Sequence, residues 1–294
     1  MNILIVGASS FIGQSIYMQA RQKKYQVVGT RYSNSSNPQL LTYDLTQHDI
    51  FKIIPTEFMN SNNICAVICS AIPKIDICYR EKERSNNLNV TRTIELIKEL
   101  QAKNIKTVFL STDAVFDGIQ GYYDEASQSD PLNQYGLQKR EVENFILSGN
   151  PDDLIVRMGI VVGDNPNVPH LFTEWYEKVR NRQPIECIKG QVFSPTYIED
   201  VANAILIALE RKLSGIYHIT NPEYFERAEL ARQFLALSKE KTIILEKELH
   251  EFNFSQKRAI KTYLDSSKFR TETNMPFTSM KEVMKNFMGN LEQE

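Results

Sequence analysis

The stretch NILIVGASSFIG, residues 2–13, places a continuous apolar run directly before a turn that is bracketed by Gly7 and Gly13. A run such as 2–6 has the length and composition of a strand that is buried on both faces. The residues from 10 to 22 then favour a helix. The chain is therefore expected to begin with a strand, a tight glycine turn and a helix.

The same alternation continues through the first two-thirds of the chain. The stretch 88–103 is helical in pattern, because Val90, Ile94, Ile97 and Leu100 recur near the helical period. Strands that alternate with helices predict an α/β fold, a Rossmann-type doubly wound parallel sheet with helices on both faces. The other apolar runs that we interpret as strands are 26–29, 64–70, 106–111 and 154–159.

The pattern becomes less regular after about residue 160. Helical patterns follow at 170–183 and 226–240, and a long apolar helix with Asp200 near its start is expected within 192–212. We expect a smaller C-terminal substrate-binding lobe over the carboxyl edge of the sheet. The predicted division is a Rossmann domain of residues 1–160 plus about 192–220, and a lobe of residues 161–191 and 221–294.

The composition excludes several classes of protein. A chain of 294 residues with 42% hydrophobic residues can bury a sizeable core. Its net charge is −2 and its basic residues are dispersed, so neither nucleic acid nor an anionic membrane surface is an expected partner. Its apolar runs fall short of the ~20 residues that span a bilayer. Residues 1–6 fit a first strand better than a signal peptide, and a cytoplasmic location is expected.

The cysteines and histidines do not predict a metal site. The four cysteines show no zinc-ligand spacing, so we expect buried thiols, and the four histidines are scattered. The cysteines are Cys65, Cys69, Cys78 and Cys187.

The glycine turn is typical of dinucleotide binding. Its first glycine permits the tight bend, its last permits close packing of helix on strand, and the helix amino end binds the diphosphate. Ser10 stands where the pattern GxxGxxG has its middle glycine, and its hydroxyl could contact phosphate. An ordinary strand-helix turn is the alternative. The residues expected to line a cofactor here are Gly7, Ser9, Ser10, Phe11, Ile12 and Gly13.

The end of the second strand bears on the choice of cofactor. The sequence GTRYSNSS, residues 29–36, offers Arg31 and no carboxylate, which favours the 2′-phosphate of NADPH, with NADH as the alternative. Arg31 could equally be a solvated surface residue. Asp44 and its neighbour Leu45 follow a third apolar run and could lie at the adenine, or Asp44 could cap a helix.

Two further segments carry catalytic residue types. FLSTDAVFDG, residues 109–118, ends a strand with Ser111 and Thr112, and NQYGLQK, residues 133–139, places Tyr135 and Lys139 one helical turn apart. A glycine turn, then Ser or Thr after a buried strand, then YxxxK resembles the extended short-chain dehydrogenase/reductase family. The blocks STDAVFDG, PLNQYGLQK and SPTYIEDVANAI resemble its dTDP-4-dehydrorhamnose reductase branch, over most of the chain.

The resemblance assigns roles to these side chains. Reduction of a ketone needs an acid beside the oxygen, and Tyr135 would be that acid. Lys139 would lower the phenol pKa from its usual value of about 10 and would hydrogen bond the nicotinamide ribose. Thr112 would hold the substrate carbonyl, although a strand-end hydroxyl can also be satisfied by backbone.

Other positions follow from the resemblance less directly. Ser70, Ala71 and Ser111 are expected to line the cofactor together with Tyr135 and Lys139. Asn89 would support the region of the active-site helix, or would be a surface helix residue.

The expected function is an NAD(P)H-dependent reductase of a nucleotide-linked 4-keto-6-deoxy sugar, with hydride delivered to C4 and Tyr135 as proton donor, in deoxysugar or surface polysaccharide biosynthesis. RMGIVVG, residues 157–163, departs from the reductase pattern and leaves the exact sugar open. A sugar-nucleotide epimerase would keep the same Tyr135 and Lys139. A non-catalytic NADP-binding subunit, like the β subunit of methionine adenosyltransferase, is the third alternative. Extended members are often dimers, so a homodimer is one expectation.

Overall fold

The computed structural model describes residues 1–294 except 33–36, 48, 62 and 293–294. The last two residues of the expected C-terminal lobe therefore lie outside the described residues. Among the described residues, every helix is too short or too polar to span a bilayer.

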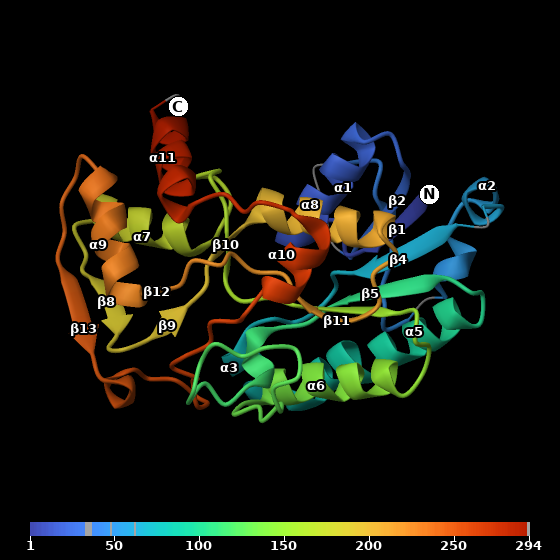
Figure 1. Ribbon diagram of the computed structural model, residues 1–294, viewed down its shortest axis with the longest axis horizontal. Coiled ribbons are helices and arrows are strands. Elements are labelled where there is room, and N and C mark those ends of the chain that lie inside the picture. The colour runs from blue at the N-terminus through green and yellow to red at the C-terminus, as the bar shows by residue number, and fades with distance from the viewer. Residues whose placement is uncertain (33–36, 48, 62, 293–294) are drawn as a thin grey trace.

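A parallel sheet of seven strands forms the centre of the described fold, as the alternation predicted (Figure 1). All of its neighbouring strands pair in parallel. The order reverses between β1 and β4, which opens a crevice at the carboxyl ends of these two strands. In spatial order the strands are β11 (Gly215–His218), β6 (Leu154–Arg157), β5 (Lys106–Leu110), β4 (Ile64–Ile68), β1 (Asn2–Val6), β2 (Gln26–Arg31) and β3 (Leu41–Thr42).

The first strand shows why these apolar runs are continuous. Successive side chains of a strand point to opposite faces, and both faces of this sheet are covered. Ile3 and Ile5 are buried in the core on one face, whereas Leu4 and Val6 are buried in the core on the other.

Helices cover both faces of the sheet (Figure 1). On one face lie α1 (Phe11–Gln22), α8 (Ile198–Glu210) and α10 (Ser267–Thr273). On the other face lie α3 (Ile75–Arg80), α4 (Lys82–Asn86), the π-helical segment η2 (Asn87–Arg92), α5 (Thr93–Gln101) and α6 (Gln134–Leu147). The helix expected over 88–103 is thus part π-helix and part α-helix. The short helices η1 (Ile50–Lys52), α2 (Thr56–Met59) and η3 (Asp113–Val115) connect strands of the sheet.

A second hydrophobic core lies beside the sheet, at the left of Figure 1. It is built on α7 (Leu171–Arg180), α9 (Arg227–Leu237) and α11 (Met280–Leu291), with the paired strands β8 (Ile185–Ile188) and β13 (Ile244–Lys247). The smaller elements there are β7 (Val161–Val162), β9 (Val192–Phe193), β10 (Thr196–Tyr197), β12 (Phe225–Glu226) and η4 (Leu249–Glu251). Helix α10 belongs to the C-terminal third of the chain, but its Phe269 is buried in the core of the sheet.

Candidate active site

The glycine turn adopts a backbone that needs both of its glycines. Gly7 has a φ of +88°, and a Cβ atom there would lie 2.6 Å from the Ser70 hydroxyl oxygen. A Cβ atom on Gly13 would lie 2.3 Å from the carbonyl oxygen of Gly7. The turn can therefore hold the start of α1 directly against β1 and β4 only because these side chains are absent.

Ser10, which replaces the middle glycine of the pattern, caps helix α1. Its hydroxyl oxygen accepts a hydrogen bond from the Gly13 amide at 3.2 Å, and its own amide donates to the Gly7 carbonyl at 3.0 Å. Capping fixes the amino end of the helix, where the dipole and the remaining amide groups attract an anion.

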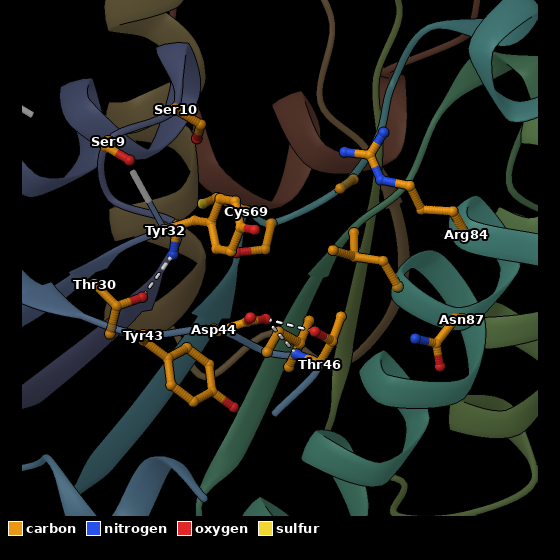
Figure 2. A pocket seen from close by; sticks show the side chains of 15 residues that line it. Ser9, Ser10, Thr30, Tyr32, Tyr43, Asp44, Thr46, Cys69, Arg84 and Asn87 are labelled. Carbon is orange, nitrogen blue, oxygen red and sulfur yellow. Dashed lines mark hydrogen bonds between the residues drawn. The ribbon is translucent and has the colours of Figure 1, made fainter. Parts of the chain in front are cut away.

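A first cavity of about 380 Å³ opens at the carboxyl ends of β1, β2 and β4 (Figure 2). Seven of the residues predicted to bind the cofactor line it, namely Gly7, Ser9, Ser10, Asp44, Leu45, Ser70 and Ala71. Sequence reasoning missed eight others, namely Thr30, Tyr32, Tyr43, Thr46, Cys69, Arg84, Asn87 and Leu88. The positions of Thr30 and Tyr32 at the end of the second apolar run were the available signal for those two.

The predicted adenosine-side residues differ in their placement. Arg31 is not among the residues that line the first cavity, and its Nε donates to the Leu40 carbonyl at 3.2 Å. Asp44 does line the cavity, and its carboxylate accepts from the Thr46 amide at 2.8 Å and from the Thr46 hydroxyl at 2.6 Å. Asp44 thus closes a turn, and the alternative role of a helix cap is not what the structure shows.

A second cavity of about 340 Å³ lies beside the first. The two cavities share Ser10, Cys69 and Ala71, so together they form one cleft across the switch point of the sheet. The predicted residues that line the second cavity are Ser10, Phe11, Ile12, Ala71, Ser111, Thr112, Tyr135 and Lys139. The other lining residues are Ile68, Cys69, Pro73 and Leu110, together with Met158, Gly159 and Val161 of the segment 157–163 that departs from the reductase pattern.

The start of helix α6 is held close to the end of β5. Asn133 caps the helix by accepting from the Gly136 amide at 3.0 Å. Gly136 packs so tightly that a Cβ atom there would lie 2.1 Å from the Ala114 carbonyl oxygen. This close approach places Tyr135 on the same cavity wall as Thr112.

Lys139 is buried one turn along the helix. Its Nζ donates to the Leu110 carbonyl at 2.7 Å and lies 4.5 Å from the centre of the Phe109 ring. Burial lowers the pKa of Lys139 to about 8, and the nearby Glu143 carboxylate opposes that shift.

Tyr135 differs from expectation in its pKa. Burial raises the pKa of Tyr135, the Asp113 carboxylate raises it further, and a hydrogen bond with the Thr112 hydroxyl opposes the shift. The expected lowering of this pKa by Lys139 is not found, because desolvation of the phenolate dominates the shift. The Thr112 hydroxyl donates to the Asp113 carboxylate at 3.1 Å and accepts from the Ala114 amide at 3.2 Å. Its proton and one of its lone pairs are therefore already in hydrogen bonds to neighbouring residues.

A buried ion pair lies beneath this site. The Glu143 carboxylate on α6 accepts a hydrogen bond from Nε of Arg157 at 3.0 Å and another from Nη2 of Arg157 at 2.7 Å. The Ser111 hydroxyl also donates to Glu143. The two charged side chains are only 2% and 4% exposed, so β5, β6 and α6 are joined by charge-assisted hydrogen bonds in the interior.

Asn89 is also part of the interior. It is buried, and it donates to the side chain of Gln138 on α6 at 2.8 Å and accepts from the Ile72 amide at 2.8 Å. The interpretation of Asn89 as a surface residue is wrong.

Cys69 also departs from prediction, because it is only partly buried and lines both cavities, whereas the other three cysteines are buried.

The parallel sheet of seven strands with helices on both faces is a Rossmann-like α/β fold, which the chain shares with solved sugar-nucleotide reductases and epimerases. The chain belongs to the family described as RmlD substrate binding domain, whose model matches residues 1–293. Its resemblance to the dTDP-4-dehydrorhamnose reductase branch is confirmed.

Two curated relatives illustrate the range of this similarity. The chain is 29% identical over 234 residues to methionine adenosyltransferase 2 subunit beta of Xenopus tropicalis, covering 77% of this chain and 69% of the relative. It is 25% identical over 226 residues to the probable low-salt glycan biosynthesis reductase Agl14 of Haloferax volcanii, covering 75% of each chain.

Solved structures match over nearly the whole length. A hypothetical dTDP-4-dehydrorhamnose reductase from Sulfolobus tokodaii is 26% identical, with a TM-score of 0.82 over 95% of this chain and 97% of that one. The dTDP-4-dehydrorhamnose reductase of Bacillus anthracis, solved in complex with NADP, is 22% identical, with a TM-score of 0.82 over 97% and 98% of the two chains. The second similarity concerns the fold alone.

Proposed function

We propose that the protein is an NAD(P)H-dependent reductase of a nucleotide-linked 4-keto-6-deoxy sugar. The observation that carries this proposal is the continuity of the cleft: the cavity at the glycine turn shares Ser10, Cys69 and Ala71 with the cavity that Thr112, Tyr135 and Lys139 line. A dinucleotide lying across a switch point in this way would bring its nicotinamide end to the tyrosine.

The residues present fit such a cofactor. The turn has no room for a side chain at Gly7 or at Gly13, and it leads into the capped amino terminus of α1, which suits a diphosphate. Asp44 would lie on the adenosine side, and Lys139 would hold the nicotinamide ribose. NADPH is the preferred cofactor in this proposal, because the stretch 29–36 offers no carboxylate for a ribose 2′-hydroxyl, and NADH is the alternative. The cofactor supplies the hydride that goes to C4 of the sugar.

The remaining chemistry belongs to the chain itself. Thr112 would hold the ketone oxygen and Tyr135 would protonate it. The Tyr135 phenol is protonated at neutral pH, which is the form a proton donor needs, and its raised pKa opposes loss of that proton until charge develops on the ketone oxygen. Lys139, with a pKa of about 8, is mostly cationic at pH 7 and would stabilise the phenolate that remains.

In this proposal, the lobe of residues 161–191 and 221–294 would bind the nucleotide-linked sugar. The product would serve deoxysugar or surface polysaccharide biosynthesis. A cytoplasmic location is part of this proposal, and a homodimer is one expectation for its assembly.

A second candidate function is that of a non-catalytic subunit, which would bind NADP and a partner protein but would not reduce a sugar. It is favoured by the 29% identity to a relative that is named as a subunit of methionine adenosyltransferase. An epimerase of the same superfamily is the third candidate, since it would use the same tyrosine and lysine without net consumption of cofactor.

The test is the decay of NADPH absorbance with purified protein and a panel of 4-keto-6-deoxyhexoses linked to dTDP, UDP, GDP or CDP. We expect turnover on one nucleotide, and a loss of at least about a hundredfold in Tyr135→Phe, because general acid catalysis contributes roughly 10²–10⁴-fold. Tyr79→Phe removes a hydroxyl from an exposed tyrosine of α3 and should leave the rate unchanged. NADPH binding without turnover on any sugar would favour the partner protein or the epimerase.

A further inference from the structure

The charges around the first cavity are few. Of the described residues that line it, Arg84 is the one cation and Asp44 is the one anion. The Asp44 carboxylate is already bound by the amide and hydroxyl of Thr46. A dinucleotide brings at least two negative charges into this space, so a cation on the wall would favour its binding in addition to the amino end of α1.

Arg84 reaches the cavity from the wall opposite the glycine turn. It comes from helix α4, and Asn87 and Leu88 of the following π-helical segment line the same wall. Figure 2 shows the guanidinium group of Arg84 extending over the cavity toward the side where Ser10 and Tyr32 lie. Its side chain is 69% exposed, so the group can turn without displacing packed atoms.

The present partner of Arg84 does not hold it strongly. Arg84 forms an ion pair with Glu81, the N-cap residue of α4, and Glu81 is itself 45% exposed. Exposed ion pairs of this kind contribute little, because water screens both charges. A guanidinium group also matches the oxygens of a phosphate in a planar, bidentate geometry, which makes exchange of Glu81 for phosphate favourable.

The placement of Arg31 strengthens the case for Arg84. Arg31 is the arginine that the sequence pattern selects, but its Nε donates to the Leu40 carbonyl and it does not line the cavity. The cation that does line the cavity is Arg84 of helix α4.

We propose that Arg84 is a phosphate-binding residue for the dinucleotide, contributed across the cleft from the glycine turn. This inference rests on the proposed function, because it requires the cleft to bind a nicotinamide dinucleotide. Arg84 would close the cleft over the cofactor phosphates, with the amino end of α1 on one side and the guanidinium on the other.

The experiment compares dissociation constants for NADPH and NADH, measured by fluorescence titration, in the wild type and in Arg84→Ala. A lost charge-assisted hydrogen bond to phosphate should weaken binding by roughly tenfold to a hundredfold. Equal losses for both cofactors would assign Arg84 to the diphosphate, and a loss for NADPH alone would assign it to the 2′-phosphate. Either result supports phosphate binding by Arg84.

Arg92→Ala is the matched control. Arg92 lies in the following segment and has a similar exposed ion pair with Glu95, three residues on, but it does not line the cavity. Its removal should leave both dissociation constants unchanged. Glu81→Gln, which frees Arg84 from its present partner, should tighten binding or leave it unchanged.

The outcomes separate this inference from the proposed function. Wild-type affinity in Arg84→Ala would overturn the role of Arg84 while leaving the reductase proposal intact. A wild-type protein that binds neither dinucleotide would overturn both. Equal weakening by Arg84→Ala and Arg92→Ala would indicate a general effect of the helix and would also overturn the assignment.

Discussion

Removal of Glu143 should destabilise the protein strongly. The Glu143 carboxylate accepts hydrogen bonds from Nε and Nη2 of Arg157 and from the Ser111 hydroxyl. Glu143→Met leaves the Arg157 guanidinium charged in an environment where its side chain is 4% exposed. Loss of one partner of a buried ion pair costs about 3–5 kcal/mol, a large fraction of the 5–15 kcal/mol that typically stabilise a folded protein.

The assay is urea unfolding followed by circular dichroism for Glu143→Met, Arg157→Met and the double variant. The double variant removes both charges and restores apolar packing, so its cost should be less than the sum of the single costs by about 2 kcal/mol or more. The exposed pair Arg92 and Glu95 serves as control, with an expected coupling below about 1 kcal/mol. A cost below about 1 kcal/mol for Glu143→Met, or additive single costs, would refute the reasoning.

Glu143→Met should also change the pKa of Lys139 in the active site. The Glu143 carboxylate supports the charge on Lys139, whose pKa is about 8. Without that carboxylate the pKa of Lys139 falls further, so the alkaline limb of the pH profile for NADPH-dependent turnover should shift to lower pH. A merely structural role of Glu143 would lower the amount of folded protein and leave the position of the limb unchanged.

Two other substitutions test the geometry of the site. Gly136→Ala would force a Cβ atom to within 2.1 Å of the Ala114 carbonyl, so we expect a loss of about 1–3 kcal/mol in urea unfolding, and weaker turnover as Tyr135 moves. Wild-type stability would contradict that close approach. Burial raises the pKa of Asp113 from 3.8 to about 6, so the wild type should lose up to about 3 kcal/mol of unfolding free energy as pH rises from 4 through 6. In Asp113→Asn that loss should be absent, and equal pH dependence of the two proteins would show that the carboxylate is not desolvated.

Much of the fold was predictable because its signals are local. Strands buried on both faces must be continuously apolar, and β1 shows this directly, with Ile3 and Leu4 in opposite cores. The glycine turn was recognisable because a backbone with a φ of +88° favours glycine. Tyr135 and Lys139 were found because a spacing of four residues places both on one helical face. The π-helical segment had no such signal.

The sequence by itself determined the class of fold, the turn and the tyrosine and lysine pair, since each depends on residues that are neighbours along the chain. The tertiary structure alone decided which side chains meet in the cleft. Arg84 and Tyr32 line one cavity although 52 positions separate them, because the sheet order brings the ends of β2 and β4 to the same edge. It also decided that Tyr135 has a raised pKa, because desolvation and the nearness of Asp113 depend on packing and not on spacing.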